Sequence, residues 1–308
     1  MSASSTSGLQ EWQVTEPYLH LHCALGEGPF YEATTNSLRF VDIKKKCIHW
    51  VNLDEGPASV TTVQLDVPVT VTSDIEGVDP RERILIGVKY GIAVLDRKTG
   101  KYEYVSRFIE GDNERLRSND GASDPHGRFW LGSMTDIGLD LQAEGHVNLF
   151  SGNPVAQSMQ HPVTIPNAFG WSPDRKTMYF THSTERTVFA WDYSMEDGSL
   201  SNERVFYRHE GPGEPDGFRV DVDGNIWHAV YGESRVLKIS PEGNLVGQIK
   251  LPTHNITCTQ FVGTELFITT AGMEAGDGPE EAVQLSGAVF KVDVGTRGLE
   301  PFAFKLRA

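Results

Sequence analysis

The sequence predicts an all-β fold, a six-bladed β-propeller with four-stranded antiparallel blades. Six segments with the aromatic and branched residues of β-strands recur along the chain, and their first residues are 40 to 50 residues apart (residues 38–43, 84–88, 128–133, 178–182, 225–230 and 265–270). After a turn or loop, each is followed by a second alternating strand (residues 47–51, 92–96, 146–150, 187–192, 235–239 and 288–292). Units of ~40–50 residues, each built of short strands, are typical of propeller blades.

Other architectures fit the pattern less well. Helical periodicity is hard to find anywhere in the chain. Two separate β-sandwiches would also contain short strands, but they would not give one period through the whole sequence. The 308 residues could form two ordinary domains, yet closed β architectures of this size are often one domain. We therefore expect a flexible segment over residues 1–11 and a single propeller domain over residues 12–308.

The composition restricts the class of partner. The chain has 27 Lys and Arg against 42 Asp and Glu, a formal net charge of −15, whereas a nucleic acid or an anionic membrane would require a basic surface. No apolar run reaches the ~18 residues of a transmembrane helix, and residues 1–12 lack the features of a secretory signal. Three cysteines, odd in number and far apart, suggest reduced packing residues. We expect a cytoplasmic protein, monomeric or weakly oligomeric, with a small-molecule partner.

Polar residues recur at the entrances of the predicted inner strands. Asp216 stands between a proline and a glycine, just before a strand, a tight Asp-Gly turn and a second strand. Asn167 and Asn119 occupy similar places in earlier units, and Glu27 stands between two glycines near the start of the chain. Because blades pack radially, equivalent entrances converge at one end of the central channel. We expect these four side chains to face one another there.

The chemistry of this set suits a metal ion. An Asp in an isolated Pro-Asp-Gly sequence more often caps its own turn, but the recurrence of the motif favours a shared site. Two carboxylates and one or two amides provide only oxygen ligands, which hard divalent cations prefer. All-oxygen ligation permits Ca²⁺, Mg²⁺, Mn²⁺ and, less typically, Zn²⁺.

The ring also has to close. We expect an N-terminal strand within residues 12–23 to pair into the last blade, beside residues 302–306.

Four motifs stand in order along the chain. They are Leu-Gly-Glu-Gly-Pro at 25–29, Arg-Ser-Asn-Asp-Gly at 117–121 with Asp-Pro-His-Gly-Arg at 124–128, Pro-Asn-Ala-Phe-Gly-Trp-Ser-Pro-Asp at 166–174, and Pro-Asp-Gly-Phe-Arg-Val-Asp-Val-Asp-Gly-Asn-Ile-Trp at 215–227. Together they resemble the regucalcin (senescence marker protein)/gluconolactonase family over almost the entire chain. The resemblance implies a six-bladed propeller that holds one divalent metal ion, Ca²⁺ first among the candidates, through Glu27, Asn167 and Asp216.

The resemblance also implies a reaction. The usual activity of the family is the hydrolysis of sugar lactones to aldonic acids, with Arg117, Asn119 and Asp120 matching a segment that lines the substrate pocket. Residues 135–145 depart from the family pattern in a region that contacts substrate in relatives, so the identity of the lactone stays open. A metal held by three protein ligands can polarise the lactone carbonyl and activate water. Asp216 can in addition serve as the general base for that water.

Three alternatives stay open at this point. A phosphotriesterase of the diisopropyl-fluorophosphatase type uses a similar ligand set, and Asn119 as a direct metal ligand would favour it. A non-enzymatic propeller, either a calcium-binding regulator or an interaction platform, is another. His20 and His22 alternate on one strand and could mimic the His pair of calcium-dependent paraoxonases, although such a pair more often packs or lies on the surface.

Overall fold

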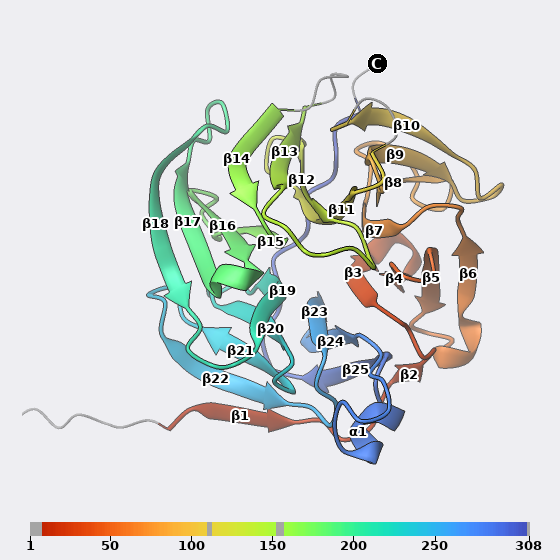
Figure 1. Ribbon diagram of the computed structural model, residues 1–308, viewed down its shortest axis with the longest axis vertical. Coiled ribbons are helices and arrows are strands. Elements are labelled where there is room, and N and C mark those ends of the chain that lie inside the picture. Colours follow the sequence, from red (N-terminus) through yellow and green to blue (C-terminus); the bar gives the residue numbers. More distant parts are fainter. Residues whose placement is uncertain (1–7, 110–112, 152–156, 307–308) are drawn as a thin grey trace, which may run out of the picture.

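The computed structural model describes residues 8–109, 113–151 and 157–306. In this part of the chain six antiparallel sheets stand around a common axis (Figure 1). The prediction of an all-β, six-bladed propeller is therefore confirmed. Each predicted strand pair forms the second and third strands of one blade, because its alternating residues bury apolar side chains on both faces of the sheet.

The first three blades follow one another along the chain, each with its strands in sequence order from the axis outwards. The first contains β3 (Gly26–Glu32), β4 (Ser37–Asp42), β5 (Cys47–Asn52) and β6 (Thr61–Gln64). The second contains β7 (Val69–Ser73), β8 (Arg83–Val88), β9 (Gly91–Asp96) and β10 (Tyr102–Arg107). The third contains β11 (Leu116–Ser123), β12 (Phe129–Thr135), β13 (Gly145–Phe150) and β14 (Gln157–Val163).

The last three blades complete the ring, and the inner strands of neighbouring blades contact one another all the way round. The fourth contains β15 (Pro166–Trp171), β16 (Thr177–His182), β17 (Thr187–Tyr193) and β18 (Leu200–Arg208). The fifth contains β19 (Glu214–Val220), β20 (Ile226–Tyr231), β21 (Arg235–Ile239) and β22 (Leu245–Lys250). The sixth contains β23 (Ile256–Val262), β24 (Glu265–Thr270) and β25 (Ala288–Asp293), with a fourth strand from the N-terminal part of the chain.

Helices are short in the described residues. They are the 3₁₀ turns η1 (Ala33–Thr35), η2 (Pro57–Ser59) and η3 (Ser183–Glu185), and the α-helix α1 (Glu280–Gln284). A helix with the length and apolar character needed to cross a membrane is not found in this part of the chain. Cys23, Cys47 and Cys258 are free and buried, which agrees with the expectation that they are reduced residues of the core.

The N-terminal part of the chain closes the ring, as predicted. Strand β2 (Leu19–His20) pairs antiparallel with β25 and completes the sixth blade. A further strand, β1 (Gln10–Gln13), pairs parallel with the outer strand of the fifth blade, so the ordered structure begins before the expected domain boundary at Trp12. The N-terminal part of the chain thus joins the fifth blade to the sixth.

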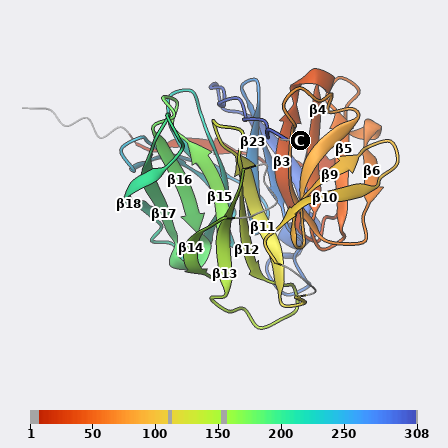
Figure 2. The ribbon, with the colours of Figure 1, turned by 90° about the horizontal axis from the view of Figure 1, so that it is seen from above.

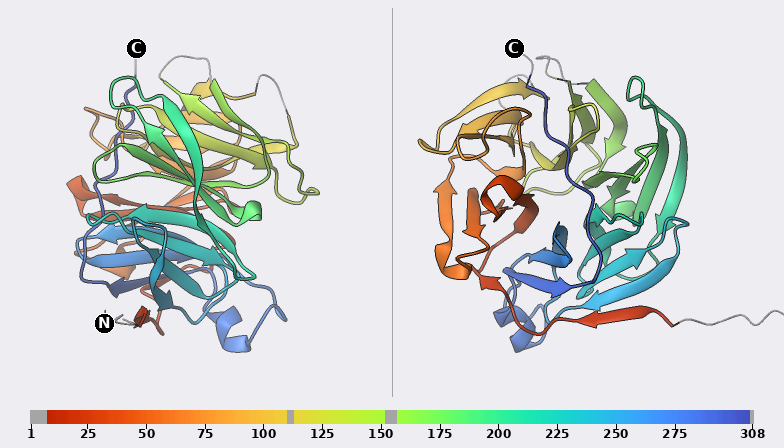
Figure 3. Two further views of the ribbon diagram at one scale, coloured as in Figure 1. Left: turned by 90° about the vertical axis from the view of Figure 1, so that its left-hand side faces the viewer. Right: turned by 180° about the vertical axis from the view of Figure 1, so that it is seen from behind.

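The C-terminal segment, by contrast, does not lie beside the last blade, and that expectation was wrong. Residues 297–306, here called the C-terminal strap, cross the end of the ring that faces away from the viewer in Figure 1 (Figure 3, right). Gly298 forms a bridge with Asp221 after β19, and Phe304 forms a bridge with Ile75 after β7. The physical reason is that β2 already occupies the outer edge of the sixth blade, while Phe304 is fully buried against Phe129 between the second and third blades.

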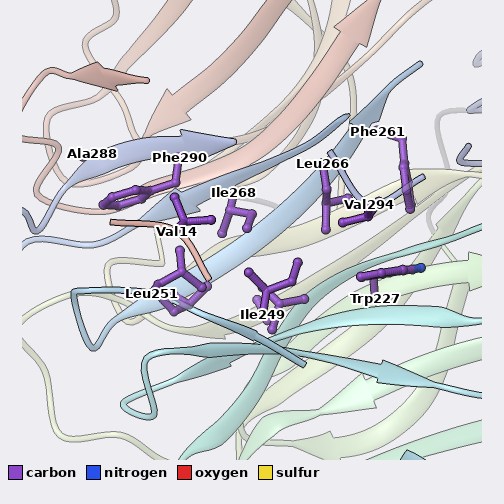
Figure 4. Packing of buried hydrophobic residues seen from close by; sticks show 13 residues of the cluster. Val14, Trp227, Ile249, Leu251, Phe261, Leu266, Ile268, Ala288, Phe290 and Val294 are labelled. Atoms are coloured by element: carbon purple, nitrogen blue, oxygen red, sulfur yellow. The ribbon is translucent and has the colours of Figure 1, made fainter. Parts of the chain in front are cut away.

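The core lies between the blades. Figure 4 shows one cluster in which the fifth and sixth blades pack through Trp227 and Ile249 on one side and Phe261 and Phe290 on the other. Seen from the side in Figure 2, the β12–β13 loop extends beyond one end of the sheets. The inner strands begin at this end, while the strap crosses the other end, beyond their last residues.

We expect Phe304→Ala to lower the free energy of unfolding by about 3–5 kcal/mol, because it removes a fully buried ring. Urea unfolding followed by circular dichroism measures this change. Leu306→Ala is the matched control, since Leu306 is 39% exposed, and should change stability by less than about 0.5 kcal/mol. Equal effects for the two variants would show that the strap contributes no packing energy.

Candidate active site

A shared backbone irregularity presents the candidate residues to the channel. Each inner strand pairs with its neighbour through a register shift near its start: between Glu27 and Phe30 in β3, Val69 and Val71 in β7, Ser118 and Gly121 in β11, Asn167 and Phe169 in β15, Pro215 and Phe218 in β19, and Ile256 and Cys258 in β23. A bulge of this kind bends the strand and re-aims side chains. Every blade therefore has this bulge. In four of the six blades an acidic or amide side chain lies at the bulge, so this end of the channel is lined by polar groups.

The structure brings the predicted residues together. Glu27, Asn119, Asn167 and Asp216 line one cavity of about 200 Å³, and Arg117 lines it as well. Asp120 is not among the lining residues. Its Oδ1 accepts a hydrogen bond from the Gly121 N–H at 2.7 Å, and its charge acts on both Glu27 and Asp216.

Three carboxylates are buried close together here, and the charges of Arg117 and Arg219 oppose only part of the resulting rise in their pKa values. Glu27, Asp120 and Asp216 are 8%, 7% and 7% exposed. Burial is the main cause that raises the pKa of each, and the neighbouring carboxylates raise the pKa of Glu27 and Asp216 further. In the described part of the chain, no ion pair joins any of the three to a Lys, Arg or His side chain.

These residues fit a divalent cation. The donors are all oxygen atoms, and a cation would offset the buried negative charge that now raises the carboxyl pKa values. Among the described residues, no three acidic, histidine or cysteine side chains are grouped so as to hold an ion by themselves. A ligand set that includes Glu27 and Asp216 would therefore need a further oxygen donor, and the amides of Asn119 and Asn167 line the same cavity.

Hydrogen bonds fix the orientation of both amides. The Asn119 Nδ2 group donates to the carbonyl oxygen of Pro166 at 2.9 Å and to Asn167 Oδ1 at 2.8 Å. The Asn167 Nδ2 group donates to the Ser183 Oγ at 2.7 Å, and the Ser183 hydroxyl donates to the carbonyl oxygen of Pro215 at 2.6 Å. Because a carbonyl oxygen can only accept, the two proline carbonyls determine which way each amide faces.

The same bond pattern surrounds each predicted metal ligand. The carbonyl group just before the ligand accepts a hydrogen bond from a side chain of the preceding blade. Thr257 donates to Gly26 before Glu27 at 2.6 Å, Asn119 donates to Pro166 before Asn167, and Ser183 donates to Pro215 before Asp216. These contacts set the spacing between neighbouring blades at the level of the cavity.

Arg117 is a buried cation at the cavity wall. It is 5% exposed, and its Nη1 donates to the Ser118 carbonyl at 2.7 Å and to Asn119 Oδ1 at 2.8 Å. Its Nε is buried without a hydrogen-bond partner among the described residues. Burial lowers the pKa of Arg117 to about 10, so the side chain stays charged at neutral pH. The nearby Asp136 opposes this decrease and is itself paired with Lys89 at 2.6 Å.

The histidines take other roles. The rings of His20 and His22 lie 4.0 Å apart, and His20 Nε2 contacts the Ser286 carbonyl oxygen at 3.1 Å. Burial lowers the pKa of His228 to about 3, and its Nε2 hydrogen-bonds Thr181 Oγ1 at 2.9 Å. No histidine is found among the described residues that line the cavity, so a paraoxonase-like histidine site is not supported.

Several further cavity residues escaped the sequence analysis, among them Glu214 at the start of β19 and three residues that follow second strands. Ser183, Lys44 and Tyr231 all line the cavity, and each lies at the end of a strand or in the turn after it. Lys44 is exposed, and Tyr231 is 37% exposed. These three residues could have been found from their positions at the ends of the second strands. The turns there surround the same end of the channel as the starts of the inner strands.

Known proteins with this sequence pattern are lactonases and regucalcins. The chain is 32% identical over 302 residues to pentonolactonase XacC of Haloferax volcanii, covering 92% of this chain and 96% of the relative. It is 31% identical over 300 residues to regucalcin of Homo sapiens, covering 92% and 95%. The fold matches that of a solved regucalcin from Agrobacterium tumefaciens with a TM-score of 0.85 and 24% identity, covering 97% of this chain and 99% of the other.

A family model covers the candidate site as well as most of the fold. The model described as the SMP-30/Gluconolactonase/LRE-like region matches residues 25–272, a span that contains all the inner-strand entrances discussed above. With that match, and with two relatives aligned over nearly their full lengths, the chain belongs to the SMP-30/gluconolactonase/LRE-like family.

Proposed function

We propose that this protein is a divalent-metal-dependent lactonase that opens sugar lactones (aldonolactones) to aldonic acids. One observation carries the proposal: buried carboxylates, an oriented amide oxygen and a buried arginine line a single cavity. Pentonolactonase XacC, which is 32% identical, is named for the same class of reaction. A binding platform has no need of several charged side chains buried together in one cavity, because burying them is costly.

Glu27, Asn167 and Asp216 are the residues we propose to hold the metal ion. Their oxygen-only chemistry favours Ca²⁺, with Mg²⁺, Mn²⁺ and Zn²⁺ as alternatives. When bound, the ion supplies a Lewis acid for the lactone carbonyl and lowers the pKa of water.

Asp216 is the residue we propose as general base. Its carboxylate is 7% exposed at the cavity, where it can accept the proton of a water that attacks the lactone carbonyl carbon. The proton can then pass to the ring oxygen as the ester bond breaks, which yields the hydroxy acid.

Arg117 is proposed to orient the lactone. Its unpartnered Nε and its positive charge suit substrate hydroxyls and the negative charge that develops on the carbonyl oxygen. Asn119 is proposed to support this group, since its Oδ1 accepts from Arg117. Asp120 is not among the lining residues, and we propose that it acts on substrate through its charge rather than by contact.

The hydrogen bonds of Asn119 favour a lactonase over a phosphotriesterase. The Asn119 oxygen accepts from the positively charged Arg117, and this charge disfavours a cation on the same oxygen, whereas the Asn167 oxygen accepts from the neutral Asn119 amide. Asn119 therefore fits a residue that orients neighbours better than a fourth ligand.

We expect metal-stripped protein to hydrolyse no γ- or δ-aldonolactone and to recover activity when one divalent cation is added back. Acid release in a pH-stat, with a panel of lactones and one cation at a time, measures this. Full activity in the presence of chelator would exclude the metal role. Failure of the metal-loaded protein to open any lactone would exclude the lactonase.

Asp216→Asn should lower kcat by ~10²-fold or more at saturating metal, because it keeps an oxygen ligand but removes the base. Asp223→Asn is the matched control, since it makes the same change of charge in an exposed turn seven positions later and should leave kcat unchanged. A wild-type kcat for Asp216→Asn at saturating metal would mean that Asp216 is not the base.

Arg117→Ala should raise KM by roughly 10- to 100-fold, the loss expected for a charged hydrogen bond to substrate. Metal Kd should change little, because the Pro166 carbonyl still orients Asn119. Arg115→Ala is the control: this exposed arginine lies two positions earlier and pairs with Glu144. A large change in metal Kd with an unchanged KM would contradict the assignment.

A further inference from the structure

We propose that Ser183 is a positioning residue that holds the Asn167 amide oxygen toward the cavity and so sets the affinity of the site for a divalent cation. The inference rests on the metal site proposed above. Ser183 is the first residue of η3, directly after β16, and is 2% exposed. It lines the same cavity as Asn167 and Asp216.

Donor and acceptor chemistry leaves one arrangement for the Ser183 hydroxyl. Its Oγ lies 2.6 Å from the Pro215 carbonyl oxygen, which has no proton to give, so the hydroxyl donates there. The Ser183 oxygen must then accept at its second contact, which is with Asn167 Nδ2 at 2.7 Å. The NH₂ group of Asn167 is thereby turned toward Ser183, and its oxygen is turned to the other side.

The opposite side of Asn167 agrees with this orientation. Asn119 directs its NH₂ group at Asn167 Oδ1, and the Pro166 carbonyl fixes that group in turn. An amide oxygen has two lone pairs, so Asn167 Oδ1 retains one for a further partner. A flipped Asn167 would present N–H groups to a cation, which repel it.

Ser183 also connects two proposed ligands through a single atom. Its Oγ contacts the side chain of Asn167 and the carbonyl group that precedes Asp216. These residues lie on the inner strands of the fourth and fifth blades. Loss of the hydroxyl would therefore release the orientation of the Asn167 amide, which is the effect on metal affinity proposed here. Outer groups that orient a metal ligand commonly change metal affinity by 10- to 100-fold.

The first measurement is the Kd of metal-stripped, full-length protein for Ca²⁺ and for Mn²⁺, by isothermal titration calorimetry. Ser183→Ala should weaken binding by roughly 10- to 100-fold. Ser73→Ala is the matched control, because Ser73 is a buried serine of the inner strand β7 whose Oγ bonds Ser123 Oγ at 2.8 Å, outside the metal-site cavity. It should bind both ions with the wild-type Kd.

The second measurement separates orientation from general stability. In an Asn167→Asp background both terminal atoms of residue 167 are oxygens, so no wrong orientation exists. There, adding Ser183→Ala should change Kd by no more than about 2-fold, the usual error of additivity. A purely structural role for Ser183 would weaken binding equally in both backgrounds, and that result would overturn the proposal.

The outcomes separate this inference from the proposed function. If the wild-type protein binds no divalent ion, the proposed metal site is wrong, and with it the metal-dependent function. If the wild-type protein binds a divalent ion and the Ser183→Ala variant binds it with the same Kd, only the proposed role of Ser183 is wrong. If Ser183→Ala does not fold, Ser183→Cys carries the same test, since its thiol keeps the shape but is a weak donor and acceptor. An unchanged Kd for that variant would equally overturn the proposal.

Discussion

Negative charge buried at one end of the channel is the constraint on which the site depends. Glu27, Asp120 and Asp216 are removed from water, and backbone N–H groups bond the carboxylates of Glu27 and Asp120. Such charge is stable only with a proton, a cation or a well-placed donor nearby. The bulged inner strands force the carboxylates together because they contact one another around the ring. A positive partner, such as the metal ion proposed above, would therefore stabilise these three side chains.

The neutral groups around this charge are organised by backbone carbonyls. In blade after blade, the residue before a proposed ligand offers its carbonyl to a side chain of the preceding blade. Proline fits two of these positions, Pro166 and Pro215, because its φ is fixed and its carbonyl stays available for such a bond. The Pro-Asn and Pro-Asp sequences thus encode two things at once, a side chain for the cavity and an acceptor for the neighbouring blade.

Sequence reasoning succeeded where a feature is repeated. The strand pairs, the polar entrances and the closure by β2 follow from a period and from an odd strand at the start of the chain. It failed for the C-terminal strap, because an alternating Phe302-Ala-Phe304 sequence looks the same in a blade edge and in a segment anchored by one buried ring. The sequence also could not identify Ser183, because its importance comes from contacts with two strands that are distant from it in sequence.

Closure by β2 has a consequence for synthesis on the ribosome. Strand β2 is made before all six inner strands, its partner β25 is made after the first five blades, and the strap that joins blades two, three and five follows β25. The first five blades can pack as they emerge, but the sixth stays incomplete until nearly the whole chain is free. During that interval the early segment has no strand to pair with in its final sheet, and an unpaired strand is an aggregation hazard. A two-residue β2 keeps that exposed edge very short.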